Sequence, residues 1–178
     1  MKKRKLKFNL YDFIIRYSFL VLVAIPNLWI FYTIFTPLTI YPVYLITKIF
    51  FNVSLSSNVI LINGHIPIDM INACIAGSAY YLLLVLNISI PKIETKERVK
   101  MILFSFLLFL IVNIIRIVIL ILIYMSSNSS FNLIHQLFWY GLSTLFVLLI
   151  WFLEIKIFKV KDIPVYSDIK SLIKFIKK

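Results

Sequence analysis

Residues 101–125 read MILFSFLLFLIVNIIRIVILILIYM, an apolar run in which Asn113 and Arg116 stand out as polar. A helix needs about 20 residues to cross the hydrocarbon core of a bilayer, and this run is long enough. The rest of the chain is similar, because 62% of the 178 residues are apolar and 15% are charged. Soluble domains carry about 45–50% apolar and about 25% charged residues. The composition therefore excludes an ordinary soluble domain and predicts one all-α integral membrane domain over residues 1–178.

Three other apolar runs are also long enough to cross a membrane. We predict four transmembrane helices, at residues 13–35, 74–90, 101–125 and 133–153. Pro26 is expected to kink the first of them. The apolar segment 37–53 contains two prolines and a lysine, so we expect an interfacial or re-entrant helix on the outer side. Whether this segment crosses the membrane stays open.

Two shorter segments have patterns of their own. Asn63-Gly64 stands between two tetrads rich in β-formers, and this dipeptide favours a tight turn. We therefore predict a short extracytoplasmic β-hairpin over residues 58–69. Residues 156–178 mix apolar side chains with lysines, which predicts a basic tail on the cytoplasmic membrane surface.

Positive charge is distributed unevenly along the chain. The formal net charge is +12, and the basic residues gather before the first helix, between the second and third helices, and after the fourth. Cytoplasmic loops of membrane proteins carry such an excess. Both termini and the 91–100 loop are therefore predicted to be cytoplasmic, in a multi-pass protein of the cell membrane. This placement of charge beside apolar runs also argues against nucleic acid as a partner.

Few residues in the chain can carry chemistry. Cys74 is the only cysteine, which rules out a disulfide framework within the chain and a multi-cysteine metal site. No cofactor or metal is expected. A buried arginine such as Arg116 is costly in lipid and needs a partner or a function. His135 lies about one turn inside the outer end of its predicted helix. His65 follows the hairpin turn and is interpreted as a surface residue.

Depth in the membrane brings three of these side chains together. Cys74 is predicted at the outer end of the second helix, and Arg116 about 13 Å from the outer end of the third. Consecutive helices with short connections pack as neighbours, so Cys74, Arg116 and His135 can share a pocket that opens outward. A thiol, an imidazole and a guanidinium suit acyl transfer, as nucleophile, general base and acid, and stabiliser of the thiolate or oxyanion.

At these residues the chain resembles the exosortase/archaeosortase family of membrane transpeptidases, and most of all the compact pacearchaeosortase branch. The matching pieces are ACIAGSAYY at residues 73–81, NIIRI at residues 113–117, and His135 at the start of the next helix. The resemblance implies that Cys74 attacks a secreted protein at a C-terminal signal made of a short motif, a transmembrane helix and a basic cluster. It also implies that His135 moves the proton, that Arg116 stabilises the thiolate or oxyanion, and that the thioester passes to a lipid or another acceptor.

Two other interpretations of the sequence stay open. The chain could be a non-enzymatic membrane subunit in which Arg116 and His135 make structural contacts. It could also be a small transporter component in which Arg116 binds an anion. The sequence does not fix the recognised sorting motif, the acceptor, the choice between hydrolysis and transfer, or the oligomeric state.

Overall fold

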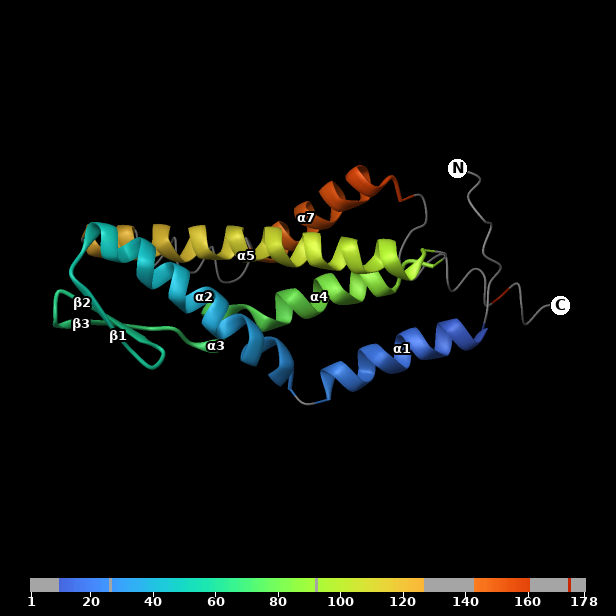
Figure 1. Ribbon diagram of the computed structural model, residues 1–178, viewed down its shortest axis with the longest axis horizontal. Coiled ribbons are helices and arrows are strands. Elements are labelled where there is room, and N and C mark those ends of the chain that lie inside the picture. Colours follow the sequence, from blue (N-terminus) through green and yellow to red (C-terminus); the bar gives the residue numbers. More distant parts are fainter. Residues whose placement is uncertain (1–9, 26, 92, 127–142, 161–172, 174–178) are drawn as a thin grey trace.

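The computed structural model describes residues 10–25, 27–91, 93–126, 143–160 and 173, and most of this part is helical (Figure 1). The sheet and the C-terminal end of the long helix α5 lie at one end of the molecule, and α1 lies towards the other. In chain order the elements are α1 (Leu10–Ala24), α2 (Trp29–Phe50), β1 (Val53–Ser56), β2 (Val59–Ile62), β3 (Ile66–Asp69), α3 (Asn72–Ile75), α4 (Gly77–Ile88), α5 (Thr95–Met125) and α7 (Ser143–Phe158).

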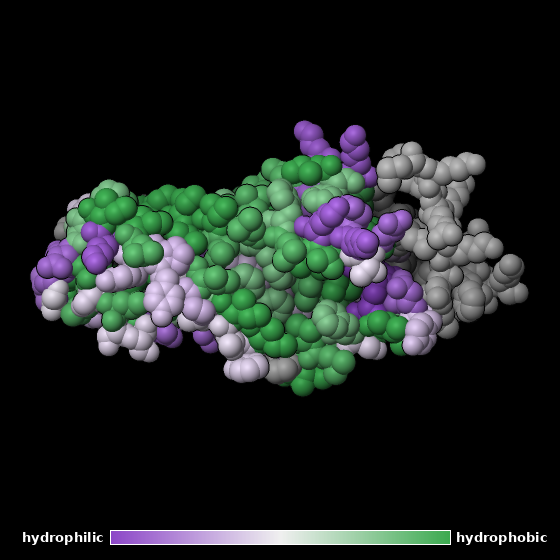
Figure 2. Space-filling view, in the orientation of Figure 1, coloured by the Kyte–Doolittle hydropathy of each residue, from purple (hydrophilic) through white to green (hydrophobic). Residues whose placement is uncertain are grey.

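Two of the described helices, α2 and α5, are long and apolar enough to cross a membrane. Only 33% of the residues in the apolar window of α2, and 28% of those in α5, are buried inside the structure. Their remaining side chains contribute to a broad apolar surface between two more hydrophilic ends (Figure 2). Soluble monomers rarely expose apolar patches larger than a few hundred Å². The outward faces of these helices therefore suit lipid better than water.

The first apolar region is divided at a different place from the one predicted. Instead of one helix over residues 13–35, α1 ends at Ala24 and α2 begins at Trp29. Asn27 and Leu28, which lie between them, have left-handed backbone angles with φ of 49° and 59°. An α-helix cannot continue through such residues. The kink predicted beside this point is therefore a complete interruption between two helices.

The second boundary also differs from the prediction, which had an interfacial or re-entrant helix over residues 37–53. Residues 37–50 belong instead to α2, which runs through Pro37 and Pro42 to Phe50, and Val53 begins β1. Each proline removes only one intrahelical hydrogen bond, and apolar helices that pack against neighbours tolerate this loss. The two prolines therefore do not end the helix, although the sequence pattern indicated a boundary there.

The hairpin predicted over residues 58–69 is present and is part of a larger sheet. β2 pairs antiparallel with β3, so that Ile62 faces Ile66 across the turn. Asn63 and Gly64 in this turn have φ of 52° and 77°, which asparagine and glycine adopt more readily than other residues. The strand β1, which the sequence analysis missed, pairs antiparallel with β2 and gives a sheet of order β1-β2-β3. The sheet follows α2 directly and leads into α3.

Aromatic side chains hold α4 against α2 and α5. Tyr80 is fully buried, and its ring stacks on that of Phe35 with a centroid distance of 3.5 Å. Phe106 and Phe109 of α5 meet the Tyr80 ring edge-on at 5.5 and 4.8 Å. Such pairs contribute about 0.5–1.5 kcal/mol each beyond the burial of their area. This cluster fixes the start of α4 beside α5, close to the preceding helix α3 that contains Cys74.

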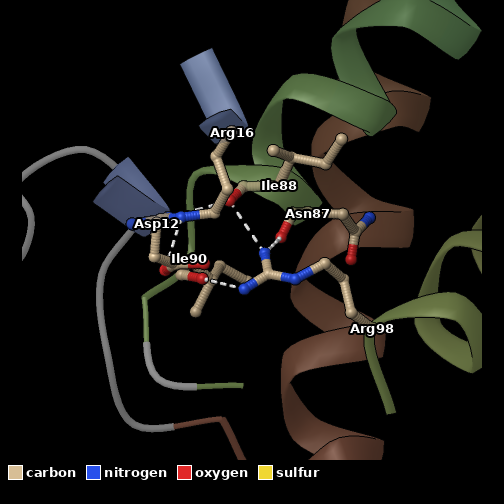
Figure 3. Close-up of polar contacts among 6 residues, drawn as sticks. All are labelled: Asp12, Arg16, Asn87, Ile88, Ile90 and Arg98. Carbon is tan, nitrogen blue, oxygen red and sulfur yellow. Dashed lines mark hydrogen bonds and ion pairs between the residues drawn. The ribbon is translucent and has the colours of Figure 1, made fainter. Parts of the chain in front are cut away.

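Two arginines cap the C-terminal end of α4, where backbone carbonyls have no partner within the helix (Figure 3). Arg98, near the start of α5, donates to three of these oxygens at 2.8–2.9 Å: those of Asn87, Ile88 and Ile90. Arg16 of α1 donates to the Ile88 oxygen at 3.0 Å and pairs with Asp12 at 3.2 Å. The start of α5 and the middle of α1 are thereby tied to the same helix end.

A buried polar cluster lies between α4, α5 and α7. Asn87, Ser105 and Glu154 each have no exposed surface. The Asn87 amide donates to Glu154 Oε2 at 3.1 Å and to Ser105 Oγ at 3.4 Å. The transmembrane helix predicted at residues 133–153 ends one residue before Glu154. In the structure it lies inside α7 and faces the other helices.

Candidate active site

The predicted helix over residues 74–90 is broken directly after the cysteine. α3 ends at Ile75, Ala76 adopts a left-handed conformation with φ 57° and ψ 43°, and α4 begins at Gly77. This conformation costs an alanine about 1–2 kcal/mol, so other contacts must hold it. Cys74 therefore lies in a single helical turn between the sheet and α4 and not at the start of a continuous helix.

The break leaves two carbonyl oxygens open, and side chains from α5 bind them. In a continuous helix the oxygens of Ala73 and Cys74 would accept the N–H groups of residues 77 and 78. Here the Asn113 amide donates to the Cys74 oxygen at 2.9 Å. Arg116 Nη2 donates to the same oxygen at 3.3 Å and to the Ala73 oxygen at 3.5 Å. The two polar residues that interrupt the 101–125 run thus meet the cysteine segment.

A cavity of about 470 Å³ lies beside this segment. Its volume is in the range of sites that hold small ligands or a short stretch of peptide. Elements from across the fold line it: α2, the end of β3, the α3–α4 break, α5 and α7. The polar or charged side chains among the lining residues are Tyr32, Asp69, Asn72, Cys74, Ser78, Arg116, Tyr124 and Thr144.

Cys74 and Arg116 line the same cavity, as the sequence analysis predicted for these two residues. The thiol is partly buried, and 9% of the Arg116 surface is exposed. A guanidinium has five N–H donors in a planar fork, so it can bind backbone oxygens and still present donors to a second group. The arrangement brings a thiol and a positively charged side chain to one cavity.

The third predicted residue, His135, lies outside the described residues, so its place relative to Cys74 is not part of the structure. His65 is exposed on the hairpin, and its Nδ1 is 2.7 Å from the Asn63 oxygen. It is not among the described residues that line the cavity. Within the described ranges, no group of three or more His, Cys, Asp or Glu side chains could hold a metal ion.

Several cavity residues were missed by sequence reasoning. Asp69 ends β3 and brings a carboxylate to the cavity wall, while Tyr32 comes from α2 and Tyr124 from the end of α5. Asp69 and Tyr124 are exposed and Tyr32 is half-buried, so the cavity has a polar rim. The position of Asp69, just before the cysteine turn, was the one available signal, because tyrosines are common throughout this chain.

The comparisons with known proteins do not extend this description. No protein-family model matches the chain, and neither the curated proteins nor the solved structures contain a match.

Proposed function

We propose that this chain is a membrane cysteine transpeptidase of the archaeosortase type, which cleaves the C-terminal sorting signal of secreted proteins and transfers them to an acceptor. The observation that carries the proposal is the shared cavity of Cys74 and Arg116, built from a helix break and a facing helix. The motif pieces around residues 73–81 and 113–117, described above, agree with it.

The proposal includes four membrane crossings, with the cavity at the outer surface. The first crossing consists of α1 and the first part of α2. Arg16 of α1 binds the C-terminal end of α4, and Phe35 of α2 stacks on Tyr80 near the N-terminal end of α4, so the two segments together run along the length of α4. The others are α3–α4, α5, and the segment 133–153 that contains most of α7. Successive crossings then alternate in direction, and the sheet and the end of α5 fall on the same side.

The spacing of two arginines on α5 supports this depth. Arg98 binds the end of α4, and Arg116 binds the turn that holds Cys74. These arginines are 18 residues apart, or about 27 Å along a helix. The hydrocarbon core of a bilayer is about 30 Å thick. If Arg98 lies at the cytoplasmic surface, as the distribution of basic residues indicates, Cys74 lies close to the opposite surface.

The proposed reaction needs a nucleophile, a proton carrier and a stabiliser of negative charge. The Cys74 sulfur attacks the carbonyl carbon of the scissile peptide bond, and the tetrahedral oxyanion forms near the Arg116 guanidinium. His135 accepts the thiol proton and returns it to the leaving amine as the C–N bond breaks. An acceptor nucleophile then attacks the thioester carbonyl, loses its proton to His135, and expels the Cys74 thiolate.

The proposed substrate also fits the surface of the protein. A sorting signal brings its own transmembrane helix, which would pack against the helices from within the lipid. Large parts of α2 and α5 face outward and are apolar, so they could receive such a helix. Helices in lipid associate through close packing and not through hydrophobic burial. The basic cluster of the signal would then lie on the same side as Arg98.

The proposal is tested by co-expressing the full-length chain with a secreted reporter that carries a tripartite sorting signal. Cys74→Ala and Arg116→Ala are expected to abolish cleavage of the reporter, and Cys74→Ser to leave at most a trace, since a serine hydroxyl is a much weaker nucleophile here. His135→Ala is expected to stop cleavage, while His65→Ala serves as its matched control and retains it. Undiminished cleavage by Cys74→Ala would overturn the mechanism.

A further inference from the structure

The carbonyl oxygen of Cys74 is bound by two side chains, and one of them has no place in the reaction proposed above. Asn113 is 2% exposed, and it is not among the described residues that line the cavity. Its amide nitrogen nevertheless lies 2.9 Å from the Cys74 oxygen, closer than Arg116 Nη2 at 3.3 Å. A residue that touches the nucleophile's backbone but not the substrate's space can act on the reaction only through position.

We propose that Asn113 is a positioning residue for Cys74: by holding the Cys74 carbonyl oxygen it maintains the helix break at Ala76, which sets the direction of the thiol. This inference rests on the function proposed above, but its first test does not require a substrate.

The hydrogen bonds around the break support this role. Ala76 donates to the Asn72 oxygen at 3.0 Å and ends α3, and Ala79 donates to the Ala76 oxygen at 3.0 Å at the start of α4. The oxygens of Ala73 and Cys74 lie between these two sets of bonds and bind side chains of α5. Without those donors, the oxygens would regain their bonds most simply by closing the break into a continuous helix. Such a rearrangement would turn Cys74 around the helix axis.

The other side of the break is fixed by packing. A Cβ atom on Gly77 would lie 2.7 Å from a ring carbon of Tyr32, so the backbone of α4 is in direct contact with this ring. Asn113 and Arg116 therefore hold the carbonyl side of the turn, and Tyr32 closes the opposite side. The left-handed Ala76 lies between these contacts.

The two donors to the Cys74 oxygen are not equivalent. Asn113 lies 2.9 Å from this oxygen, whereas Arg116 makes longer bonds of 3.3 and 3.5 Å to the two carbonyls. Charge-assisted hydrogen bonds are usually the shorter ones, yet here the neutral amide of Asn113 makes the shorter bond to the Cys74 oxygen. Asn113 is therefore the closer of these two donors to the carbonyl of the nucleophile.

The amide orientation is fixed by chemistry. Two oxygens at 2.9 Å would repel each other, so the nitrogen of Asn113 must face the Cys74 carbonyl. Its Oδ1 has no hydrogen-bond partner among the described residues. Among the described residues, the hydrogen bond to the Cys74 oxygen is therefore the one polar contact of this side chain.

The first experiment measures the reactivity of the thiol in the full-length protein in micelles. Because Cys74 is the only cysteine, the rate of alkylation by N-ethylmaleimide, followed across pH, reports on this site alone. Asn113→Leu removes the donor at similar size. It is expected to change the rate or the pH midpoint of alkylation. Asn87→Leu is the matched control, because Asn87 is equally buried but lies at the far end of α4. It is expected to keep the native alkylation profile.

The second experiment measures kcat and KM with the reporter. Asn113→Leu is expected to lower kcat about 10²-fold, the cost of misplacing a reacting group by about 1 Å, with KM within about twofold. Adding Ala76→Gly is expected to recover about tenfold, because glycine adopts the left-handed conformation readily. If Asn113→Leu lowered kcat only by disturbing the packing of α5, the added Ala76→Gly would not restore kcat. Asn113→Gln keeps a donor on a longer side chain, and its alkylation profile is expected between those of native protein and Asn113→Leu.

The outcomes separate the two proposals. Native alkylation and native kcat in Asn113→Leu or Asn113→Gln would overturn the positioning role while leaving the transpeptidase intact. Cleavage by Cys74→Ala would overturn the transpeptidase, and the alkylation profile would still decide whether Asn113 positions the cysteine. If Asn113→Leu does not fold, Asn113→Gln and Asn87→Leu decide the question by the same alkylation measurement.

Discussion

The depth of Cys74 can be measured directly, because no other cysteine competes with it. A matched position at the other end of α5 is Lys100, which is exposed and whose ion pair with Glu97 is also on the surface. Lys100 precedes Arg116 by 16 residues, or about 24 Å along the helix. Native protein and the double variant Cys74→Ala/Lys100→Cys therefore carry single thiols on opposite sides of the proposed membrane.

The assay labels intact cells with a sulfonated maleimide and repeats the labelling after permeabilisation. We expect Cys74 to react fully in intact cells, because the cavity of about 470 Å³ has the exposed Asp69 and Tyr124 at its rim. The thiol at position 100 is expected to react only after permeabilisation. A charged group faces a barrier of at least about 2.5–3.5 kcal/mol at the centre of the bilayer, so the two rates in intact cells should differ by roughly 10² or more.

Two results would refute the reasoning. If Cys74 reacted only after permeabilisation, the nucleophile would face the cytoplasm and could not reach a secreted protein. If both thiols reacted equally in intact cells, α5 would not separate the two aqueous sides. A maleimide without the sulfonate, which crosses membranes, is the control. A thiol that is merely buried in the protein reacts with neither reagent, whereas a thiol on the cytoplasmic side reacts with this one in intact cells.

Three further predictions concern stability, measured as the free energy of unfolding in micelles. Gly77→Ala is expected to cost about 1–3 kcal/mol, because the new Cβ overlaps the Tyr32 ring, and this cost should largely disappear in a Tyr32→Ala background. Glu154→Leu is expected to cost about 1–3 kcal/mol, because it removes an acceptor of the Asn87 amide. Glu154→Gln keeps an acceptor oxygen, so its free energy of unfolding should lie within about 1 kcal/mol of the native value. Equal losses in the two variants would contradict this account. Arg98→Met is expected to cost about 2–4 kcal/mol, since three carbonyls at the end of α4 lose a charged donor, while the exposed neighbour Lys96 can be changed to Met without measurable loss.

The parts of the fold that could be predicted from sequence are those with a local cause. The apolar run at 101–125 lies inside α5, and the hairpin turn lies at Asn63-Gly64, where both residues have positive φ. The start of α5 was missed by several residues because Thr95 and the charged residues after it have no apolar pattern. Strand β1 was missed for a similar reason, since four residues that follow a long apolar helix carry little signal of their own.

The parts that could not be predicted depend on distant contacts. The break after Cys74 falls at Ala76, a residue type that ordinarily favours helix, and the neighbouring Gly77 begins the next helix and is not the left-handed residue. Its stabilising donors come from residues 39 and 42 positions further along the chain. The meeting of Cys74 with Arg116 was predictable because helix depth can be counted, but the hydrogen bonds to backbone oxygens depend on the break itself.

Arg98 and Arg116, both on α5, show why an arginine that binds another helix is weak evidence for catalysis when taken alone. Both bind backbone oxygens that a helix end leaves open, Arg98 at the end of α4 and Arg116 at the end of α3. This contact by itself accounts for the presence of each charge, because it satisfies groups that lipid cannot hydrate. Only Arg116 also lines a cavity with a thiol. Under the proposed function, the difference between a structural and a reactive arginine is therefore the neighbouring Cys74 and the space beside it. A variant that fills this cavity while keeping both sets of hydrogen bonds should then stop the proposed reaction and leave the fold unchanged.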